Sequence, residues 1–373
     1  MSSNIDKYIK KCGINGKWTL FPKPQKKYKN IIVIPAYAEL DYIFNTLESI
    51  DKCDVKCFSD IMVVVVVNNE NEALNEVILN NKKTLRMLFE KKYSYFLSII
   101  DASTNEFCVS SKYAGVGMAR KIGMDLVLKY CFSDSLLYCL DADTIVSEKY
   151  FKIIQSFFGS SDSIAAVVGF SHLKSDNKLL EKAIREYESF LNITAINLNS
   201  AGSPYGYVSM GSTIICKVDA YIAIGGMPNK KATEDFYFLQ KFAKYKRVDK
   251  INEVLVYPSP RASDRVFLGT GFRMSQFLLG KKIKDLFYPI NAFRILEDWL
   301  LIATSGFNKD IKDIMFQTQS ISMDLYDFLK KENIENIWNK ISENSTTENQ
   351  FVSQFHRWFD ALKTYRFLNT YIS

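Results

Sequence analysis

The chain has 373 residues, of which 47% are hydrophobic and 24% are charged, with a formal net charge of +7. This composition excludes a disordered chain and predicts a substantial buried core. The charge suits an anionic ligand or membrane surface, but no DNA- or RNA-reading motif is present, so we expect no nucleic-acid partner. Two histidines, and seven cysteines without paired CxxC spacing, argue against a histidine-based metal site and a disulfide framework.

Residues 1–30 are basic and include the stretch "FPKPQKKYKN", which predicts a solvated N-terminal arm. The segment lacks the apolar core of a signal peptide. The strongest apolar run, residues 61–67, is far shorter than the ~20 residues of a membrane helix. We therefore expect a soluble cytoplasmic protein, and a peripheral contact with the inner membrane face is compatible with the basic arm.

From residue 31 onward, apolar runs alternate with helical patterns. The runs "IIVIP" (ended by its proline), "IMVVVVV", "YFLSII" and "LLYCL" predict strands, and the segments between them predict helices. Fully apolar strands that alternate with helices are typical of a parallel sheet buried on both faces. Ligands of such sheets bind at the carboxyl ends of the strands, where Pro35, Asn68, Asp101 and Asp141 are expected.

The pattern of expected secondary structure changes twice along the rest of the chain. Residues 150–275 mix short strands with a long helical stretch, and the pattern beyond about 285 is helical throughout. We therefore predict a basic arm over 1–30, an α/β domain over 31–275 and a helical C-terminal region over 276–373.

Two aspartates separated by one alanine follow the fourth predicted strand, in "LLYCLDADTIV". Asp141 and Asp143 are hard oxygen ligands at a strand exit, and such a pair suits Mg²⁺ or Mn²⁺ completed by water and substrate phosphates. The alternative is that they begin the next helix, with Asp143 or Ser147 as its cap.

A second acidic pair, Glu234–Asp235, opens a helical stretch. One interpretation is a carboxylate presented at a cleft as a general base. The other is a helix start, with Thr233 as its cap and the acidic residues favoured by the helix dipole. The loop "YPSPRASDRVFLGTGFR" follows, and its arginines would suit bidentate binding of a diphosphate or would simply be solvated.

The order of these motifs over about residues 30–265 resembles that of family 2 glycosyltransferases of the GT-A fold. The resemblance implies a Rossmann-like, mostly parallel central sheet flanked by helices, with a helical C-terminal extension. No Q-x-x-R-W motif follows "TED" and no membrane helix is expected, so the resemblance is to non-processive members.

The resemblance also implies site residues, position by position. Those implied to bind the nucleotide or donor are Pro35, Tyr37, Glu39, Asn68, Asn69, Gly115, Arg120, Asp141, Gly211, Ser212, Arg261 and Arg265. Asp141 and Asp143 match the D-x-D motif that holds the donor diphosphate through a divalent metal, Mn²⁺ or Mg²⁺. Asp235, beside Glu234, matches the catalytic base of inverting members.

The implied function is metal-dependent transfer of a sugar, of the hexosyltransferase type, to an acceptor hydroxyl. The donor would be a nucleotide sugar, with UDP-sugars favoured over GDP-sugars, and the acceptor a glycan or lipid-linked molecule in cell-surface glycan or glycoconjugate synthesis. A homo-oligomer is compatible with this function. Ala38 and the Asn68–Asn69 pair depart from the family's asparagine and acidic pair, which leaves the nucleotide base open.

Two other readings of the sequence stay open. "LLYCLDADTIV" also fits the motif of haloacid-dehalogenase-type phosphatases, in which Asp141 would be the nucleophile and Asp143 the acid, with Mg²⁺. That motif normally opens its domain, whereas three strand–helix units precede it here. The third reading is a non-catalytic nucleotide-sugar-binding protein on a GT-A scaffold.

Overall fold

The computed structural model describes residues 4–14, 16–55, 57–263, 265 and 268–372. The chain forms two compact units. The first takes the chain up to Ile184, with Ser209–Phe242 and Arg247–Leu279, and the second takes Arg185–Val208, Ala243–Lys246 and the chain from Gly280 onward. The main boundary therefore follows residue 279, whereas the sequence predicts one after 275.

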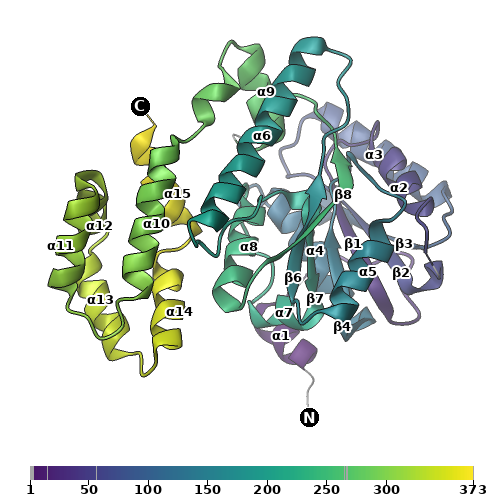
Figure 1. The fold of residues 1–373 in the computed structure, drawn as a ribbon. Coiled ribbons are helices and arrows are strands. Elements are labelled where there is room, and N and C mark those ends of the chain that lie inside the picture. The colour runs from purple at the N-terminus through teal and green to yellow at the C-terminus, as the bar shows by residue number, and fades with distance from the viewer. Residues whose placement is uncertain (1–3, 15, 56, 264, 266–267, 373) are drawn as a thin grey trace. The chain divides into compact units, whose positions relative to one another are not determined.

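The first unit is an α/β structure, and its elements are labelled in Figure 1. Its strands are β1 (Tyr28–Ala36), β2 (Ile61–Asn68), β3 (Phe96–Ala102), β4 (Cys131–Cys139), β5 (Thr144–Val146), β6 (Ala165–Phe170), β7 (Ile214–Lys217) and β8 (Asp249–Pro258). Its α-helices are α1 (Asn4–Cys12), α2 (Ile43–Asp51), α3 (Asn75–Glu90), α4 (Val116–Val127), α5 (Tyr150–Ser160), α7 (Val218–Ala223) and α9 (Thr270–Leu278). Short 3₁₀ turns are η1 (Phe58–Asp60), η2 (Asn105–Phe107), η3 (Leu128–Tyr130) and η4 (Gly211–Thr213).

The strands form one 8-stranded sheet with the order β3-β2-β1-β4-β7-β6-β8-β5. The pairs β1–β2, β2–β3, β1–β4 and β6–β8 are parallel, whereas β7 pairs antiparallel with β4 and β6, and β5 pairs antiparallel with β8. The predicted α/β class with a mostly parallel sheet is confirmed. The antiparallel strands were not predicted, because short strands carry little periodic signal.

The sheet has a topological switch point between β1 and β4. The chain leaves β1 toward β2 and β3 on one side, then returns through α4 to β4 on the other side of β1. At such a point the connecting loops diverge and leave a crevice outside the carboxyl ends of the two strands. The loops that follow β1 and β4 carry Glu39, Asp141 and Asp143, so the fold brings the predicted metal and donor residues to one edge.

Local packing explains why these central strands are apolar. Every residue of β2 is buried, as expected for a strand covered on both faces. Helix α4 packs so closely on the sheet that a Cβ on Gly123 would collide with Val33 of β1. The first strand runs one residue past the predicted stop at Pro35. This is tolerated because the β1–β4 ladder ends at Val33, so the proline leaves no ladder hydrogen bond unmade on that side.

The N-terminal arm is only partly solvated: most of its described residues are exposed, as the sequence predicts, but its helix α1 docks through a buried tyrosine. Tyr8 of α1 is buried, and its hydroxyl donates to Asp125 of α4 at 2.9 Å. The same carboxylate accepts from Lys121 at 2.8 Å and from Tyr221 at 2.7 Å. Residues 1–3 and 15 of the arm lie outside the described residues. A buried carboxylate with several donors ties α1 to α4, which explains why this polar segment is ordered.

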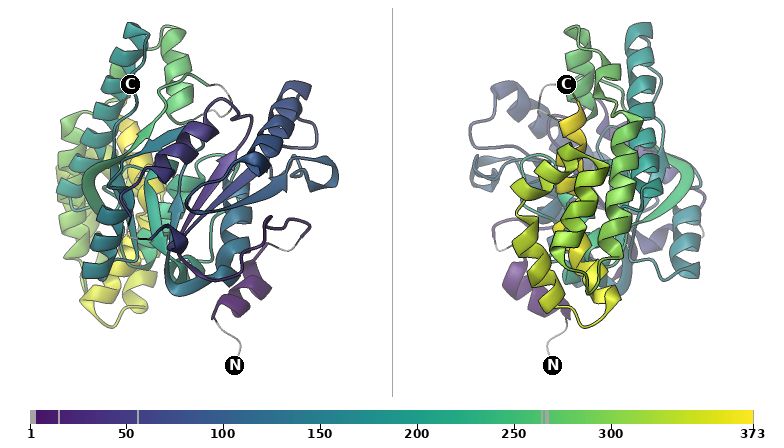
Figure 2. Two further views of the ribbon diagram at one scale, coloured as in Figure 1. Left: turned by 90° about the vertical axis from the view of Figure 1, so that its right-hand side faces the viewer. Right: turned by 60° about the vertical axis from the view of Figure 1, so that its left-hand side comes forward.

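The second unit is helical. It contains α10 (Ile290–Thr304), α11 (Ile311–Ile321), α12 (Met323–Lys331), α13 (Ile334–Glu343), α14 (Glu348–Trp358) and α15 (Ala361–Leu368), with the 3₁₀ turns η5 (Ile283–Leu286) and η6 (Asn369–Tyr371). Helices α6 (Lys178–Ser200) and α8 (Glu234–Tyr245) run from the first unit into the second. The predicted helical C-terminal region is confirmed, and its helices pack as a bundle (Figure 2).

The bundle has its own aromatic core. Trp299 of α10 lies edge-on to Phe355 and Phe359, at ring-centroid distances of 5.6 and 6.0 Å. Side chains cap helix starts, as where Asp360 accepts from the backbone N–H of Lys363. In the described part of the chain, no helix is both long and apolar enough to cross a membrane.

Candidate active site

Arg120 of α4 joins the two acidic pairs that the sequence singles out. Its Nη2 donates to Asp141, just beyond β4, and its Nη1 donates to Glu234 at the start of α8. Arg120 and Glu234 are almost fully buried, whereas the side chain of Asp141 is 33% exposed. One guanidinium thus connects two carboxylates, and the three side chains come from three separate segments of the chain.

Burial and charge act in opposite directions in this cluster. Burial lowers the pKa of Arg120, but the carboxylates of Asp141 and Glu234 outweigh it and raise that pKa above its usual range. Burial also raises the pKa of Glu234, against the pull of Arg120. The pKa of Asp235 is raised by burial in the same way. A carboxylate with a raised pKa binds protons more readily, which suits a general base.

The backbone at Asp235 differs from a simple helix start. The N–H of Phe236 donates to Asp235 Oδ1 at 2.7 Å, whereas the Thr233 hydroxyl donates to the carbonyl of Ala232. Thr233 also has a φ of 62°, which is uncommon for a β-branched residue. The predicted alternative of Thr233 as a conventional cap is therefore not what the structure contains, and strain of this kind is often concentrated at functional sites.

A second cluster surrounds Glu39, which is buried in the loop after β1. Arg261 Nη2 donates to both of its carboxylate oxygens, at 2.6 and 2.8 Å. Arg265 Nη2 lies 2.7 Å from Glu39 Oε1, and its Nη1 donates to the carbonyl of Tyr37 at 2.7 Å. Arg261 and Arg265, two of the three arginines of the predicted diphosphate-binding loop, are thus anchored to the end of β1 and are not simply solvated.

Arg261 also reaches the D-x-D segment. Its Nε lies 2.9 Å from Asp143 Oδ2, and its Cζ lies 4.2 Å from the centroid of the Tyr42 ring. Burial raises the pKa of Asp143 to about 6, although Arg261 opposes the rise. The predicted alternative in which Asp143 or Ser147 caps the next helix is wrong, because α5 begins only at Tyr150, with Lys149 at the cap position.

A short ladder fixes the distance between these two loops. Thr144 of β5 pairs with Pro258 of β8, and the N–H of Ser259 donates to the carbonyl of Asp143 at 3.1 Å. Asp143 and Arg261 therefore leave the same end of one two-stranded ribbon, which holds them at interacting distance.

Asp141 and Asp143 offer carboxylate oxygens of the kind that a divalent cation needs as ligands. Each uses one oxygen for an arginine, and within the described residues no hydrogen bond or ion pair engages the second oxygen, Oδ2 of Asp141 or Oδ1 of Asp143. No group of three or more His, Cys, Asp or Glu in that part of the chain could form a protein cage. This fits Mg²⁺ or Mn²⁺ held by one or two carboxylates plus substrate phosphates and water.

The end of β2 holds an amide pair with two different environments. Asn69 Oδ1 accepts from Asn81 at 2.8 Å, whereas Asn68 Oδ1 is buried without a hydrogen-bond partner among the described residues. The Tyr37 hydroxyl, which lies near this edge, donates to Glu70 at 3.1 Å. An unpaired buried acceptor is costly for a protein to keep, so a ligand group would relieve it.

The predicted glycines and Ser212 are placed for packing. A Cβ on Gly115 would stand 2.7 Å from the carbonyl oxygen of Lys231, so this glycine admits the loop before α8. A Cβ on Gly211 would stand 2.8 Å from Cζ of Arg120. Ser212 is fully buried, and its Oγ has no partner among the described residues. Within the described residues, no hydrogen bond or ion pair joins Pro35, Asn68, Asn69, Gly115 or Ser212 to either arginine cluster.

Sequence reasoning missed two residues that shape the site. Asn81 of α3 accepts from the backbone N–H of Ala38 at 3.0 Å and donates to the carbonyl of Asn68 at 3.1 Å. The sequence feature that could have identified Asn81 is a polar residue on a largely apolar face of the helix. Tyr42 gives Arg261 its aromatic partner, and nothing in the sequence distinguishes it from the chain's other tyrosines.

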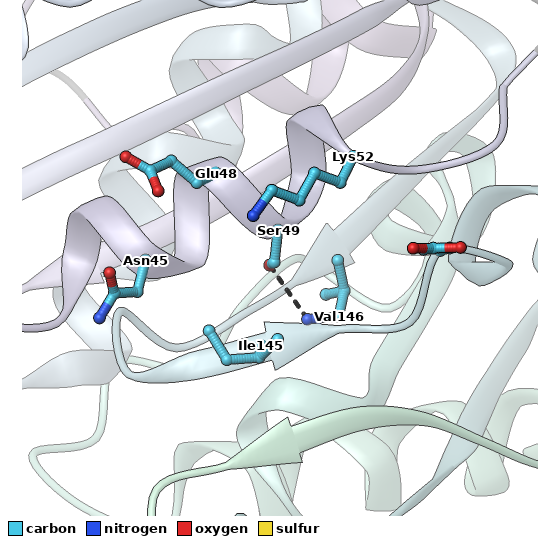
Figure 3. Close-up of a pocket in the computed structure, with 7 residues that line it drawn as sticks. Asn45, Glu48, Ser49, Lys52, Ile145 and Val146 are labelled. Atoms are coloured by element: carbon cyan, nitrogen blue, oxygen red, sulfur yellow. Dashed lines mark hydrogen bonds between the residues drawn. The ribbon is translucent and has the colours of Figure 1, made fainter.

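A polar hollow of about 340 Å³ lies elsewhere, between α2 and β5 (Figure 3). It is lined by Asn45, Glu48, Ser49, Lys52, Ile145, Val146 and Glu148, none of which the sequence predicts as a site residue. The Val146 N–H donates to Ser49 Oγ at 3.1 Å across it. The hollow thus contains a contact that fixes β5, the strand after the acidic pair.

Among solved structures, the chain is similar to S. aureus TarS in complex with UDP-GlcNAc, with a TM-score of 0.47, 14% identity and coverage of 91% of both chains. It is also similar to the mannosyltransferase PcManGT from Pyrobaculum calidifontis in complex with GDP-Man and Mn²⁺, with a TM-score of 0.40, 12% identity, and coverage of 96% of this chain and 93% of that one.

No curated protein matches the chain. The family model described as "Glycosyltransferase like family 2" matches residues 29–190, a segment that includes β1, the switch point, Arg120 and both aspartates of the D-x-D motif. The sheet and the helical C-terminal region have the GT-A-like arrangement that the sequence predicts. Residues 29–190 are therefore similar to glycosyltransferase family 2.

Proposed function

We propose that the protein is a metal-dependent, non-processive glycosyltransferase that moves a hexose from a nucleoside-diphosphate sugar to an acceptor hydroxyl of a glycan or lipid-linked molecule. The observation that carries the proposal is the junction of Asp141, Arg120 and Glu234 at the switch point, with Asp235 next to it. It joins a candidate metal-binding carboxylate, Asp141, to the segment that carries the candidate base. Asp141 and Arg120 lie within the segment matched by the family model, residues 29–190.

The acceptor would be activated by Asp235. One of its oxygens is held by the N–H of Phe236, and Oδ2 makes no hydrogen bond within the described residues, so it can take the hydroxyl proton. The raised pKa of Asp235 makes it a stronger base than an exposed aspartate. Glu234 would act as a positioning residue, because it orients Arg120 against Asp141.

The departing diphosphate would be received at the other cluster. When bound by Asp141 and Asp143, a divalent cation supplies positive charge to the diphosphate as its negative charge develops. Arg261 and Arg265 offer planar guanidinium groups, which match phosphate oxygens in pairs. Both are anchored beside Asp143 through Glu39, which supports their assignment to the leaving group.

A UDP-sugar is the favoured donor because of Asn68. A carboxamide offers a donor and an acceptor side by side, and uracil presents the complementary N3–H and carbonyl. Guanine would present an additional amino group that one amide cannot also satisfy. The unpaired Oδ1 of Asn68 at the end of β2 supports this assignment.

The test is nucleotide release and ligand binding with a panel of UDP-, GDP-, CMP- and dTDP-sugars. It would use Mn²⁺ or Mg²⁺, EDTA, Asp143→Asn, and Asp134→Asn as a matched control, because Asp134 is exposed and pairs with Lys29 at the surface. We expect metal-dependent release from one donor that is lost in Asp143→Asn and kept in the control. If no donor binds with metal present, the proposal fails. Hydrolysis of phosphate esters would favour the phosphatase reading, and donor binding without transfer to any acceptor would favour the binding protein.

A further inference from the structure

The two arginines of the loop after β8 are already engaged before any ligand is considered. Arg261 spans two carboxylates, with Nη2 on Glu39 at 2.6 Å and Nε on Asp143 Oδ2 at 2.9 Å. Arg265 adds a second guanidinium on Glu39 at 2.7 Å. Groups suited to a diphosphate therefore occupy one of the oxygens that a divalent cation would need.

The electrostatics explain why this arrangement forms. Glu39 and Asp143 are mostly buried, with side-chain exposures of 7% and 19%. A buried carboxylate without a partner is strongly destabilising. A guanidinium is always charged, and its planar fork can serve two acceptors while its face rests on the Tyr42 ring. In the absence of a cation, Arg261 supplies the positive charge that Asp143 requires.

We infer that Arg261 is a resident counter-ion of Asp143, tethered by Glu39, which competes with a divalent cation for the charge of this carboxylate and which a nucleoside diphosphate draws away. Glu39 is then a positioning residue for the arginine loop and not a ligand of the nucleotide. Metal and nucleotide bind cooperatively as a result, because the metal frees Arg261 for the diphosphate and the diphosphate frees Asp143 for the metal. The second half of this inference rests on the proposed function.

Arg261→Gln is the decisive change. It removes the competing cation at Asp143 and so leaves that carboxylate open to Mn²⁺, while Glu39 keeps Arg265 as its partner. The same change removes one diphosphate ligand. The inference therefore predicts two effects of opposite sign in one variant: Mn²⁺ alone binds more tightly, and UDP in the presence of Mn²⁺ binds more weakly.

The experiment measures free Mn²⁺ by electron paramagnetic resonance during titration of the full chain, and UDP binding by calorimetry with and without Mn²⁺. For Arg261→Gln we expect Mn²⁺ alone to bind roughly 10-fold more tightly and UDP with Mn²⁺ to bind roughly 10-fold more weakly, within the usual range of coupling between sites. The control is Arg247→Gln, the same substitution at an exposed arginine paired with Asp162 and Asp249. It should change neither affinity.

If Arg261→Gln does not fold, as judged by circular dichroism, Arg261→Lys keeps the charge but cannot bridge Glu39 and Asp143. It should tighten Mn²⁺ binding by a smaller factor. Unchanged or weaker binding of Mn²⁺ alone in the folded variant overturns the inference. If wild-type protein binds no nucleotide with Mn²⁺, the proposed function fails, but the comparison with Mn²⁺ alone still decides whether Arg261 competes at Asp143.

Discussion

Gly211 leaves the space that the guanidinium of Arg120 occupies: a Cβ on Gly211 would stand 2.8 Å from Cζ of Arg120. Because that guanidinium joins Asp141 and Glu234, the absence of a side chain at Gly211 is a condition for the central cluster. The glycine is thus required by close approach to another side chain, and its own φ is not in the left-handed region.

Gly211→Ala should therefore displace Arg120 and destabilise the protein. Overpacking of this kind costs about 1–3 kcal/mol, which urea unfolding would measure. The matched control is Gly159→Ala, near the end of α5, where a Cβ would meet no atom within 4 Å. The free energy of unfolding of this variant should rise by up to roughly 1 kcal/mol, since alanine favours the helix. An equal change in both variants would contradict the packing argument.

Asp235→Asn should separate catalysis from binding. Loss of a general base lowers the rate by roughly 10²–10⁴-fold, whereas UDP should bind with unchanged affinity in the presence of Mn²⁺. Steady-state transfer assays and calorimetry on the same preparation would check both. Asp219→Asn, at an exposed position in α7, serves as the control and should leave both unchanged. If Asp235→Asn also lost affinity for UDP, the result would indicate that Asp235 helps to bind the donor and is not the base that takes the acceptor's proton.

Ala38 has a φ of 53°, in the left-handed region. This conformation costs an ordinary L-residue roughly 1–2 kcal/mol and is tolerated by asparagine. Ala38→Asn should thus raise the free energy of unfolding by about 1 kcal/mol. The reciprocal change is Asn308→Ala, because Asn308 has a φ of 62° and is exposed. Urea unfolding should show changes in the free energy of unfolding that are opposite in sign for the two variants. The idea fails if Ala38→Asn is destabilising.

His356 makes the stability of the helical unit depend on pH. Burial lowers its pKa from 6.5 to about 4, and its Nδ1 has no partner among the described residues. The unfolded chain therefore binds this proton more tightly than the folded chain. Stability is complete above pH 6.5 and falls as the pH drops toward 4, at no more than about 1.4 kcal/mol per pH unit.

Urea unfolding between pH 7.5 and 4.5, followed by fluorescence, would measure this slope, because Trp299, Trp338 and Trp358 all lie in the helical unit. His356→Gln cannot titrate and should show a flatter profile over the same window. An unchanged slope in that variant would assign the pH dependence to other groups.

The central strands could be predicted because their signal is local. The β-branched runs of β1 and β2 are buried on both faces, so nearly every residue carries the pattern. The alignment of the strand ends followed from the same pattern, since the carboxyl ends of parallel strands at Pro35, Asn68 and Asp141 lie at one edge. The strand order, and with it the switch point, was not predicted. The D-x-D segment was therefore predicted on the correct edge of the sheet.

The pairing of each carboxylate with its arginine could not be predicted. Arg261 lies 118 positions after Asp143 in the numbering of the chain, and their contact depends on the three-residue strand β5, which has no periodic signal. Burial of Tyr8 was missed for a related reason. The apolar residues Ile5, Tyr8, Ile9 and Cys12 recur at helical spacing, but lysines and an aspartate stand between them. The buried partner of the Tyr8 hydroxyl, Asp125, is far away in the sequence.

The β5–β8 ribbon has a consequence for insertions and deletions in related chains. The pairing of Thr144 with Pro258 brings together the two ends of a long segment, residues 145–257. The length of this segment can change without moving Asp143 relative to Arg261. A single residue added between Pro258 and Arg261 would instead shift the guanidinium by roughly 3.3 Å, the rise of one extended residue. In related chains, insertions and deletions should accumulate within the segment that corresponds to residues 145–257. They should be rare between Pro258 and Arg261.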